Sequence, residues 1–322
     1  MALAGSALRC DVACRSEGAG LPVYAITLGD SDPALPAVGY FGGVHGLERI
    51  GARVVIAFLH HLVMRLVWDA SLQQLLRQVR LLFMPVVNPA GLQRGTRSNA
   101  NGVDLMRNAP VQALDAAAWP VGGQRLSRRL PWYRGARDAA MQAESAALCE
   151  WVARELHGRP FALAVDCHSG FGLRDRLWFP FAHRRAPMPA LAEMHALHEI
   201  FSASHAHHPY VVEPQSRQYL AHGDLWDHLV LQGEGRGVFL PLTLEMGSWL
   251  WVKKNPRQLF SRAGIFNPLI AHREQRVLRR HLPLLDFALR AAAGHALWLP
   301  RGAAREVHHR RALDLWYGGS GA

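Results

Sequence analysis

The chain has 322 residues, of which 50% are hydrophobic, and its mean hydropathy is -0.01. This composition supplies enough apolar side chains for one large packed core or two small ones, and it excludes a disordered chain. No apolar run reaches the roughly 18 residues that are needed to cross a bilayer, so we expect no membrane partner.

The formal net charge is +11, and most of the positive charge comes from scattered arginines. The densest basic run, at 125–137, reads RLSRRLPWYRGAR. Basic charge without a binding motif is a weak signal for nucleic acid, so we expect a solvated loop there and no nucleic-acid partner. The four cysteines are Cys10, Cys14, Cys149 and Cys167, and no secretory leader is evident at the N-terminus. These features predict free thiols and a cytoplasmic protein.

Apolar runs of two kinds divide the chain, short ones bounded by Gly, Pro or Asn and longer ones with a period near 3.6. In chain order we expect strands Val23–Leu28 and Ala37–Phe41, helix Leu47–Val67, strand Val79–Val87, a long surface loop over 109–139, helix Ala140–Leu156, strand Phe161–Cys167, helix Leu191–Ser204, strand Val238–Glu245 and helix Glu274–His295, kinked at Pro283.

Strands alternate with helices, and several strands are apolar throughout. This pattern predicts an α/β fold with a mixed, largely parallel twisted sheet and helices on both faces. We expect a single catalytic domain over 1–296 and a basic C-terminal tail over 297–322. Functional sites in such sheets form at the carboxyl ends of strands, and His45, His168 and Glu245 all lie at or just past expected strand ends.

His45 and Glu48 are three residues apart at the start of an expected helix, which places both side chains on the same side of one turn. An imidazole and a carboxylate are suitable zinc ligands, and catalytic zinc usually has three protein ligands plus water. The pair alone is also typical of a surface histidine beside a glutamate that is stabilised by the helix dipole at the start of a helix.

A third ligand must come from another segment, and His168 closes a buried strand before the loop Ser169–Gly172. A lone histidine at a strand end is also typical of a hydrogen-bonded structural residue. The chain has 18 histidines, and the rivals to His168 are His205, His207, His208, His222 and His228. His207 and His208 lie in a polar loop without a carboxylate at helical ligand spacing, so we place them below His168.

Arginines and one aspartate follow the strand that ends at Asn88, namely Arg94, Arg97, Asp104 and Arg107. Arginine binds a carboxylate through a two-pronged fork and stabilises an oxyanion. Further along, Glu245 ends an apolar strand, where a carboxylate is unfavourable to bury without a partner. Beside a metal it would serve as a general base, and elsewhere as half of a structural salt bridge.

Taken in order, these segments resemble the zinc carboxypeptidase superfamily, the carboxypeptidase A-like metallopeptidases. The resemblance covers roughly residues 35–250, and the ordered set is far more specific than any one motif. The matching motifs are HGLE at His45, NPAG at Asn88, QRGTR at Gln93, GVDLMRN at Gly102, DCHSG at Asp166 and TLEMG at Thr243.

The resemblance implies that His45, Glu48 and His168 hold one zinc ion per chain and that Glu245 is the general base. It also implies that Asp104 orients a ligand histidine, most simply His45.

For the substrate, the resemblance implies that Arg94 polarises the scissile carbonyl and that Arg107 binds a terminal carboxylate. Arg97 is placed with the substrate-binding residues. Tyr219 matches the family's mobile tyrosine only with a one-residue gap. The expected substrate is a peptide or an acyl-amino acid that carries a carboxylate.

The chain departs from the family at Met106, which replaces an asparagine that helps to bind a C-terminal carboxylate. Methionine cannot donate those hydrogen bonds, so the departure questions ordinary C-terminal specificity. The leading hypothesis is a metallocarboxypeptidase or peptide amidase. The alternatives are an N-acyl amino-acid deacylase of the desuccinylase or aspartoacylase type, and a non-catalytic binding protein on the same fold. Trp249 and Trp251 are candidates for a specificity wall or for core packing.

Overall fold

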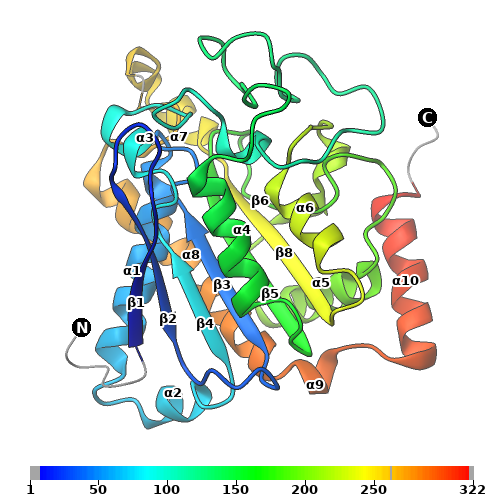
Figure 1. The fold of residues 1–322 in the computed structure, drawn as a ribbon. Helices are drawn as coiled ribbons and strands as arrows, with labels where there is room; N and C mark the ends of the chain where they lie inside the picture. Colours follow the sequence, from blue (N-terminus) through cyan, green and yellow to red (C-terminus); the bar gives the residue numbers. More distant parts are fainter. Residues whose placement is uncertain (1–7, 262, 319–322) are drawn as a thin grey trace.

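The computed structural model describes residues 8–261 and 263–318 (Figure 1). One eight-stranded sheet runs through them in the order β1-β2-β4-β3-β5-β8-β6-β7. The strands are β1 (Leu8–Arg15), β2 (Pro22–Leu28), β3 (Ala37–Gly42), β4 (Arg80–Met84), β5 (Phe161–Ser169), β6 (Arg176–Phe179), β7 (Val211–Pro214) and β8 (Val238–Met246).

Helices cover both faces of this sheet (Figure 1). On one face, α1 and α8 pack against β3 and β5, and α5 packs against β8; on the other face, α4 packs against β1 and β4, and α6 against β8. The helices are α1 (Arg49–Arg65), α2 (Ala70–Leu75), α3 (Pro89–Arg94), α4 (Ala143–Glu155), α5 (Leu191–Ser204), α6 (Leu225–Gln232), α7 (Trp249–Lys254), α8 (Ala271–Ala293), α9 (His295–Trp298) and α10 (Gly302–Trp316).

The central strands are parallel, as the sequence predicts. β4, β3, β5 and β8 pair in parallel, β6 pairs in parallel with β7, and antiparallel pairs join β1 to β2, β2 to β4 and β6 to β8. Every residue of β3 and β5 is buried, because helices cover both faces of the sheet. The predicted mixed, largely parallel sheet with helices on both faces is confirmed.

Pro241 lies inside β8, where a residue without a backbone N–H usually weakens a sheet. β5 pairs with β8 along its whole length, whereas β6 pairs only with the stretch from Thr243 to Glu245. Pro241 therefore has a strand neighbour on one side only, which explains why the strand tolerates it.

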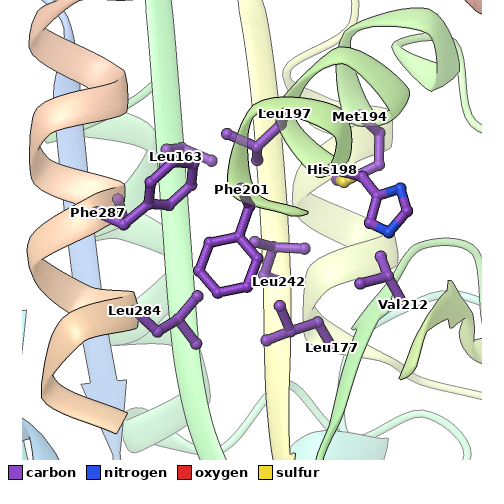
Figure 2. A pocket seen from close by; sticks show the side chains of 11 residues that line it. Leu163, Leu177, Met194, Leu197, His198, Phe201, Val212, Leu242, Leu284 and Phe287 are labelled. Atoms are coloured by element: carbon purple, nitrogen blue, oxygen red, sulfur yellow. The ribbon is translucent and has the colours of Figure 1, made fainter. Parts of the chain in front are cut away.

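Apolar side chains from α5, α8 and the neighbouring strands enclose a small cavity of about 20 Å³ (Figure 2). Its lining includes Leu163 on β5, Phe201 on α5 and Leu284 on α8. The lining is apolar apart from the imidazole of His198, and a space of this size is close to the volume of one water probe. The cavity is a packing space of the core and not a ligand site.

Two ends of the chain differ from the sequence expectation. β1 forms an edge strand whose residues are mostly half-buried or exposed, so its sequence LRCDVACR carries no clean apolar alternation. The segment expected as a basic tail, 297–322, contains α10, which packs against α5. Trp316 of α10 is buried, and its indole Nε1 donates to the carbonyl of Val212 at 2.8 Å. α10 is therefore part of the packed fold.

The long loop expected over 109–139 is confirmed, since its only pairing among the described residues is an isolated bridge between Gln124 and Tyr133. Arginines of the basic run hold this loop together. Arg125 donates to the carbonyl of Gly135 at 2.7 Å, and buried Arg134 donates to the carbonyl of Arg107 at 3.1 Å. Within 8–261 and 263–318, no helix has both the length and the apolar character that a membrane crossing requires.

Candidate metal centre and active site

His45 and Glu48 lie in the turn that joins β3 to α1. The turn packs against α3 so closely that a Cβ on Gly46 would lie 1.9 Å from the carbonyl carbon of Gly91, so only glycine fits there. Glu48 donates its N–H to the carbonyl of His45 at 3.0 Å. The two residues are 3% and 2% exposed, so the predicted pair faces the interior of the molecule.

His168 and Glu245 lie side by side on the neighbouring strands β5 and β8. They are register partners in a parallel pair, which brings two residues that are 77 positions apart in the sequence to the same edge of the sheet. Glu245 Oε1 accepts a hydrogen bond from the Phe171 N–H at 3.0 Å. The strand pairing thus places the predicted third ligand and the predicted base together.

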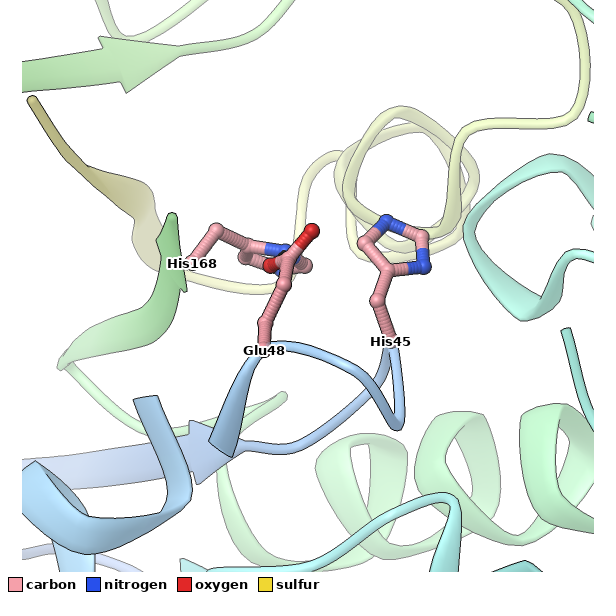
Figure 3. Close-up of side chains that lie close together, drawn as sticks. All are labelled: His45, Glu48 and His168. Carbon is pink, nitrogen blue, oxygen red and sulfur yellow. Dashed lines mark hydrogen bonds and ion pairs between the residues drawn. The ribbon is translucent and has the colours of Figure 1, made fainter. Parts of the chain in front are cut away.

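The side chains of His45, Glu48 and His168 converge (Figure 3), and their candidate ligand atoms all lie within 4.8 Å of one another. His168 Nδ1 lies 3.0 Å from Glu48 Oε2, and the two imidazole rings are 5.0 Å apart between centroids. Two imidazoles and one carboxylate are the ligand set of a catalytic zinc site that keeps a position open for water or substrate.

Carboxylates stand behind both histidines. Asp166 Oδ2 lies 2.7 Å from His168 Nε2 and also accepts the indole N–H of Trp226 at 3.0 Å. Asp104 Oδ1 lies 3.6 Å from His45 Nδ1. A carboxylate on the far ring nitrogen fixes the orientation of a metal-binding histidine and raises its basicity. Asp104 was expected in this place. Asp166 was not assigned a role, although it precedes His168 by two residues on one strand and shares its face.

The electrostatics of the cluster suit a bound cation. Burial and the neighbouring Glu48 raise the pKa of Glu245 to about 8. Burial works against a charge on His168, but Asp166 and Glu48 outweigh it and raise the pKa of His168 well above its usual range. Burial and the nearby Arg97 lower the pKa of His45. Crowded buried carboxylates next to a neutral imidazole are the environment that a divalent ion stabilises, so the residues present fit zinc.

The structure separates the two arginines of the QRGTR segment. Arg97 reaches the cluster, with Nε donating to Asp104 Oδ2 at 2.8 Å, one Nη 2.7 Å from His45 Nε2, and the other 3.5 Å from Glu48 Oε1. Arg94 is exposed and donates to the carbonyl of Ala100 at 3.2 Å. The position that the sequence analysis gave to Arg94 is therefore occupied by Arg97.

A cavity of about 740 Å³ opens beside the cluster and is lined by His45, Glu48, His168 and Glu245. Arg107 and Tyr219 line the same cavity, and an Nη of Arg107 donates to the Tyr219 hydroxyl at 3.4 Å. The cavity has the size of a typical small-molecule site, and it joins the cluster to a buried arginine.

The model of the zinc carboxypeptidase family, peptidase M14, matches residues 10–233, which is more than half of the chain. The chain belongs to the zinc carboxypeptidase family. Zinc is the metal of this family, and the cluster of two histidines and a glutamate provides its ligand set. Glu245 lies beyond the matched residues, so its place in the site rests on the pairing of β5 with β8.

Known proteins match parts of the chain. Carboxypeptidase SOL1 of Arabidopsis thaliana is 34% identical over 96 residues, which are 29% of this chain and 20% of that protein. Carboxypeptidase E of Caenorhabditis elegans is 29% identical over 161 residues, which are 46% of this chain and 33% of that protein. The chain therefore spans a third or less of the length of these relatives.

Solved structures match most of the chain. Thrombin activatable fibrinolysis inhibitor superposes with a TM-score of 0.67 at 18% identity, over 90% of this chain and 70% of that chain. Carboxypeptidase A from Helicoverpa armigera superposes with a TM-score of 0.64 at 18% identity, again over 90% and 70%. At this identity the likeness shows that the chain has the carboxypeptidase fold.

The rival histidines lie elsewhere in this zinc carboxypeptidase fold. His222 accepts the N–H of Ala113 through Nδ1 at 2.9 Å, and His205 stacks on Phe201 at 5.0 Å between ring centroids. Within the described part of the chain, none of the five rivals joins a group of three candidate ligands.

Loop residues that the sequence could not place form the walls of the cavity. Arg128, Arg129 and Trp132 line it from the 109–139 loop, and Trp249 lines it from the start of α7. The Trp249 indole donates to the carbonyl of Gly170 at 2.8 Å, whereas Trp251 packs against the hydrophobic core. Each tryptophan therefore takes a different one of the two expected places: Trp249 lines the cavity, and Trp251 packs against the core.

Proposed function

We propose that this zinc carboxypeptidase family member is a zinc-dependent hydrolase that cleaves a peptide or amide bond near a carboxylate of its substrate, as a metallocarboxypeptidase or a peptide amidase. The observation that carries the proposal is the placement of Glu245 beside His168 and Glu48 in a cavity that also contains Arg107. A hydrolase of this type needs a metal site, a base next to it and a cationic anchor for the substrate.

His45, Glu48 and His168 would hold the zinc ion, with Asp104 and Asp166 fixing the two rings. Bound zinc supplies a Lewis acid that acidifies water and polarises a carbonyl group. Asp166 hydrogen-bonds the far nitrogen of His168 at 2.7 Å and so fixes that ring, while Asp104 lies 3.6 Å from His45 Nδ1 and would orient that ring when zinc is bound.

Glu245 would act as the general base, taking a proton from the attacking water and delivering it to the leaving amine. The Phe171 N–H holds one carboxylate oxygen at 3.0 Å, which leaves the other oxygen free for proton transfer. Burial and Glu48 raise the pKa of Glu245 to about 8, and a general base with a raised pKa works well near neutral pH.

Arg97 would stabilise the oxyanion that forms on the scissile carbonyl. Its guanidinium is anchored by Asp104 through Nε at 2.8 Å and lies between His45 and Glu48. An anchored guanidinium is preorganised, so it needs no rearrangement when negative charge develops.

Arg107 and Tyr219 would bind the carboxylate end of the substrate. Arg107 is buried, and its guanidinium lies over the Tyr219 ring at 5.7 Å from the centroid. Met106 lines the same cavity and supplies no hydrogen-bond donor there. We propose that a carboxylate is therefore held chiefly by Arg107, and that the enzyme favours a substrate whose carboxylate is not the ordinary C-terminus of a simple peptide.

The family match favours peptide or amide cleavage over the deacylase hypothesis, and a base beside the metal ligands favours an enzyme over a non-catalytic protein. We also propose that the chain acts in a reducing compartment such as the cytoplasm, without a nucleic-acid partner. The four unpaired cysteines support a reducing compartment, and Arg125 and Arg134, which donate to backbone carbonyls of the protein itself, support the lack of a nucleic-acid partner.

The test is hydrolysis of a library of peptides and acyl-amino acids, with free and amidated C-termini, followed by mass spectrometry. We expect cleavage only of substrates with a carboxylate, and we expect Glu245→Gln to retain zinc while kcat/KM falls by about 100-fold. Glu234→Gln, at an exposed glutamate, is the control and should keep full activity. Normal turnover in Glu245→Gln with zinc bound would refute the proposed base.

A further inference from the structure

A second group of metal-ligand side chains lies between α5 and α10, away from the catalytic cavity. Within residues 8–261 and 263–318, the candidate ligand atoms of His195, Glu199 and His308 lie within 4.8 Å of one another. His195 and Glu199 are four residues apart on α5, so they share one face of that helix, and His308 faces them from α10. None of the three lines the catalytic cavity.

The candidate ligand atoms lie close together, and His195 turns Nδ1 toward His308 and Nε2 toward Glu199. His195 Nδ1 and His308 Nδ1 are 3.0 Å apart, while Glu199 lies 3.9 Å from His195 Nε2 and 3.7 Å from His308 Nδ1. Two ring nitrogens with facing lone pairs repel each other unless one carries a proton or a cation lies between them. Two imidazoles and a carboxylate suit zinc and similar borderline divalent ions.

The burial of the group suits a metal ion that is bound by a buried histidine on one side and by water molecules on the exposed side. His195 is buried at 4% exposure, whereas the side chains of His308 and Glu199 are 20% and 43% exposed. Burial lowers the pKa of His195, and the nearby His308, His198 and Arg311 lower it further, while Glu199 opposes them.

We propose that His195, Glu199 and His308 form a second divalent-metal site, selective for zinc-like ions, that fastens α10 to α5. The catalytic zinc and this ion would be independent, because the two sites share no residue. The site would add to the contacts that already hold α10, which include the ion pair of Arg305 with Glu193 at 2.6 Å and the buried Trp316.

One neighbour distinguishes a metal site from a purely hydrogen-bonded cluster. An Nη of Arg311 lies 3.4 Å from Glu199 Oε1, so this arginine competes with a metal ion for the carboxylate. If the cluster binds metal, removing Arg311 should strengthen zinc binding by about fivefold, because a like charge close to the ion is lost. If the cluster is only a hydrogen-bond network, removing Arg311 should weaken it.

The experiment is a zinc titration of the full chain against a chromophoric chelator, combined with thermal unfolding. We expect two zinc ions per chain in the unsubstituted protein and one in His308→Ala. In a His168→Ala background, which removes a catalytic ligand, we expect one zinc ion, and adding His308→Ala should abolish the binding of that ion. Zinc should also raise the unfolding temperature of the His168→Ala protein, and that rise should vanish in the double variant.

His309→Ala is the matched control, because His309 is the next residue on α10 and does not belong to the group; it should still bind two ions. Glu199→Gln tests the carboxylate should His308→Ala fail to fold. The proposal is overturned if the unsubstituted chain binds one ion only, or if His308→Ala still binds two. It is equally overturned if Arg311→Ala lowers the unfolding temperature and leaves zinc affinity unchanged.

Discussion

Arg97 and Arg94 offer the sharpest test of the active-site geometry, since they are three residues apart in the same segment and the structure places only Arg97 in the cluster. Arg97 contacts Asp104, His45 and Glu48, whereas Arg94 is exposed and donates to the backbone carbonyl of Ala100. We therefore expect Arg97→Gln to impair catalysis and Arg94→Gln to leave it unchanged. Glutamine shortens the side chain and removes the charge, and it keeps one polar group near Asp104.

The expected size of the effect follows from the role proposed for Arg97. Loss of one oxyanion donor lowers kcat by about 10²–10³-fold, which corresponds to about 2.7–4 kcal/mol of transition-state stabilisation. Arg97 is also the partner of Asp104, which is 1% exposed, and an unpaired buried carboxylate destabilises a fold by about 3–5 kcal/mol. Arg97→Gln should therefore lower the unfolding temperature as well as the rate.

The assay is kcat/KM on the best substrate of the peptide library, with zinc content and unfolding temperature measured on the same samples. Arg97→Lys separates charge from geometry, because lysine keeps the positive charge and loses the planar fork; it should recover stability better than activity. Equal rates for Arg97→Gln and the unsubstituted enzyme at full zinc occupancy would refute the role of Arg97. A larger loss of kcat/KM in Arg94→Gln than in Arg97→Gln would show that Arg94, as the sequence predicted, and not Arg97 acts on the scissile carbonyl.

Three further predictions test the metal, the specificity and the core. His168→Ala should lose about one zinc ion per chain by elemental analysis, and unchanged zinc content would exclude His168 as a ligand. Met106→Asn should raise kcat/KM for a blocked dipeptide with a free C-terminus by about tenfold, or about 1.4 kcal/mol; if the unsubstituted enzyme already cleaves it well and the variant is no better, Met106 does not direct specificity. Burial lowers the pKa of His281 from its ordinary value to about 4, so the unfolded chain binds the extra proton and stability should fall by up to about 3 kcal/mol from about pH 6.5 to pH 4. His281→Asn should flatten that part of the urea-unfolding profile, and an unchanged slope would contradict the assignment.

The central fold was predictable because a strand that is buried on both faces needs apolar residues at nearly every position. β3, β5 and β8 read as uninterrupted apolar runs, and polar residues that end such runs mark the edge where sites form. His168 and Glu245 were placed together by that logic. β1 was not predicted, because an edge strand with half-exposed residues has no need of an apolar pattern. The C-terminal helix α10 was missed because charged residues on its exposed side outnumber the few that it buries, such as Ala312 and Trp316.

In the active site, the local sequence alone does not determine which arginine reaches the metal ligands. α3 ends at Gly95, which has a positive φ of 63°, and a left-handed residue at this position reverses the chain direction. Arg94 lies before that reversal and Arg97 after it, so the choice between the two arginines depends on the turn and not on residue type.

Asp166 was within reach of sequence reasoning, because residues two apart on a strand share a face. The part of the cavity wall that comes from the 109–139 loop was not, because Arg128 and Trp132 join Trp249 only after distant segments fold over the sheet. We expect those walls to set substrate choice, so that related sequences with the same metal ligands would differ in what they cleave.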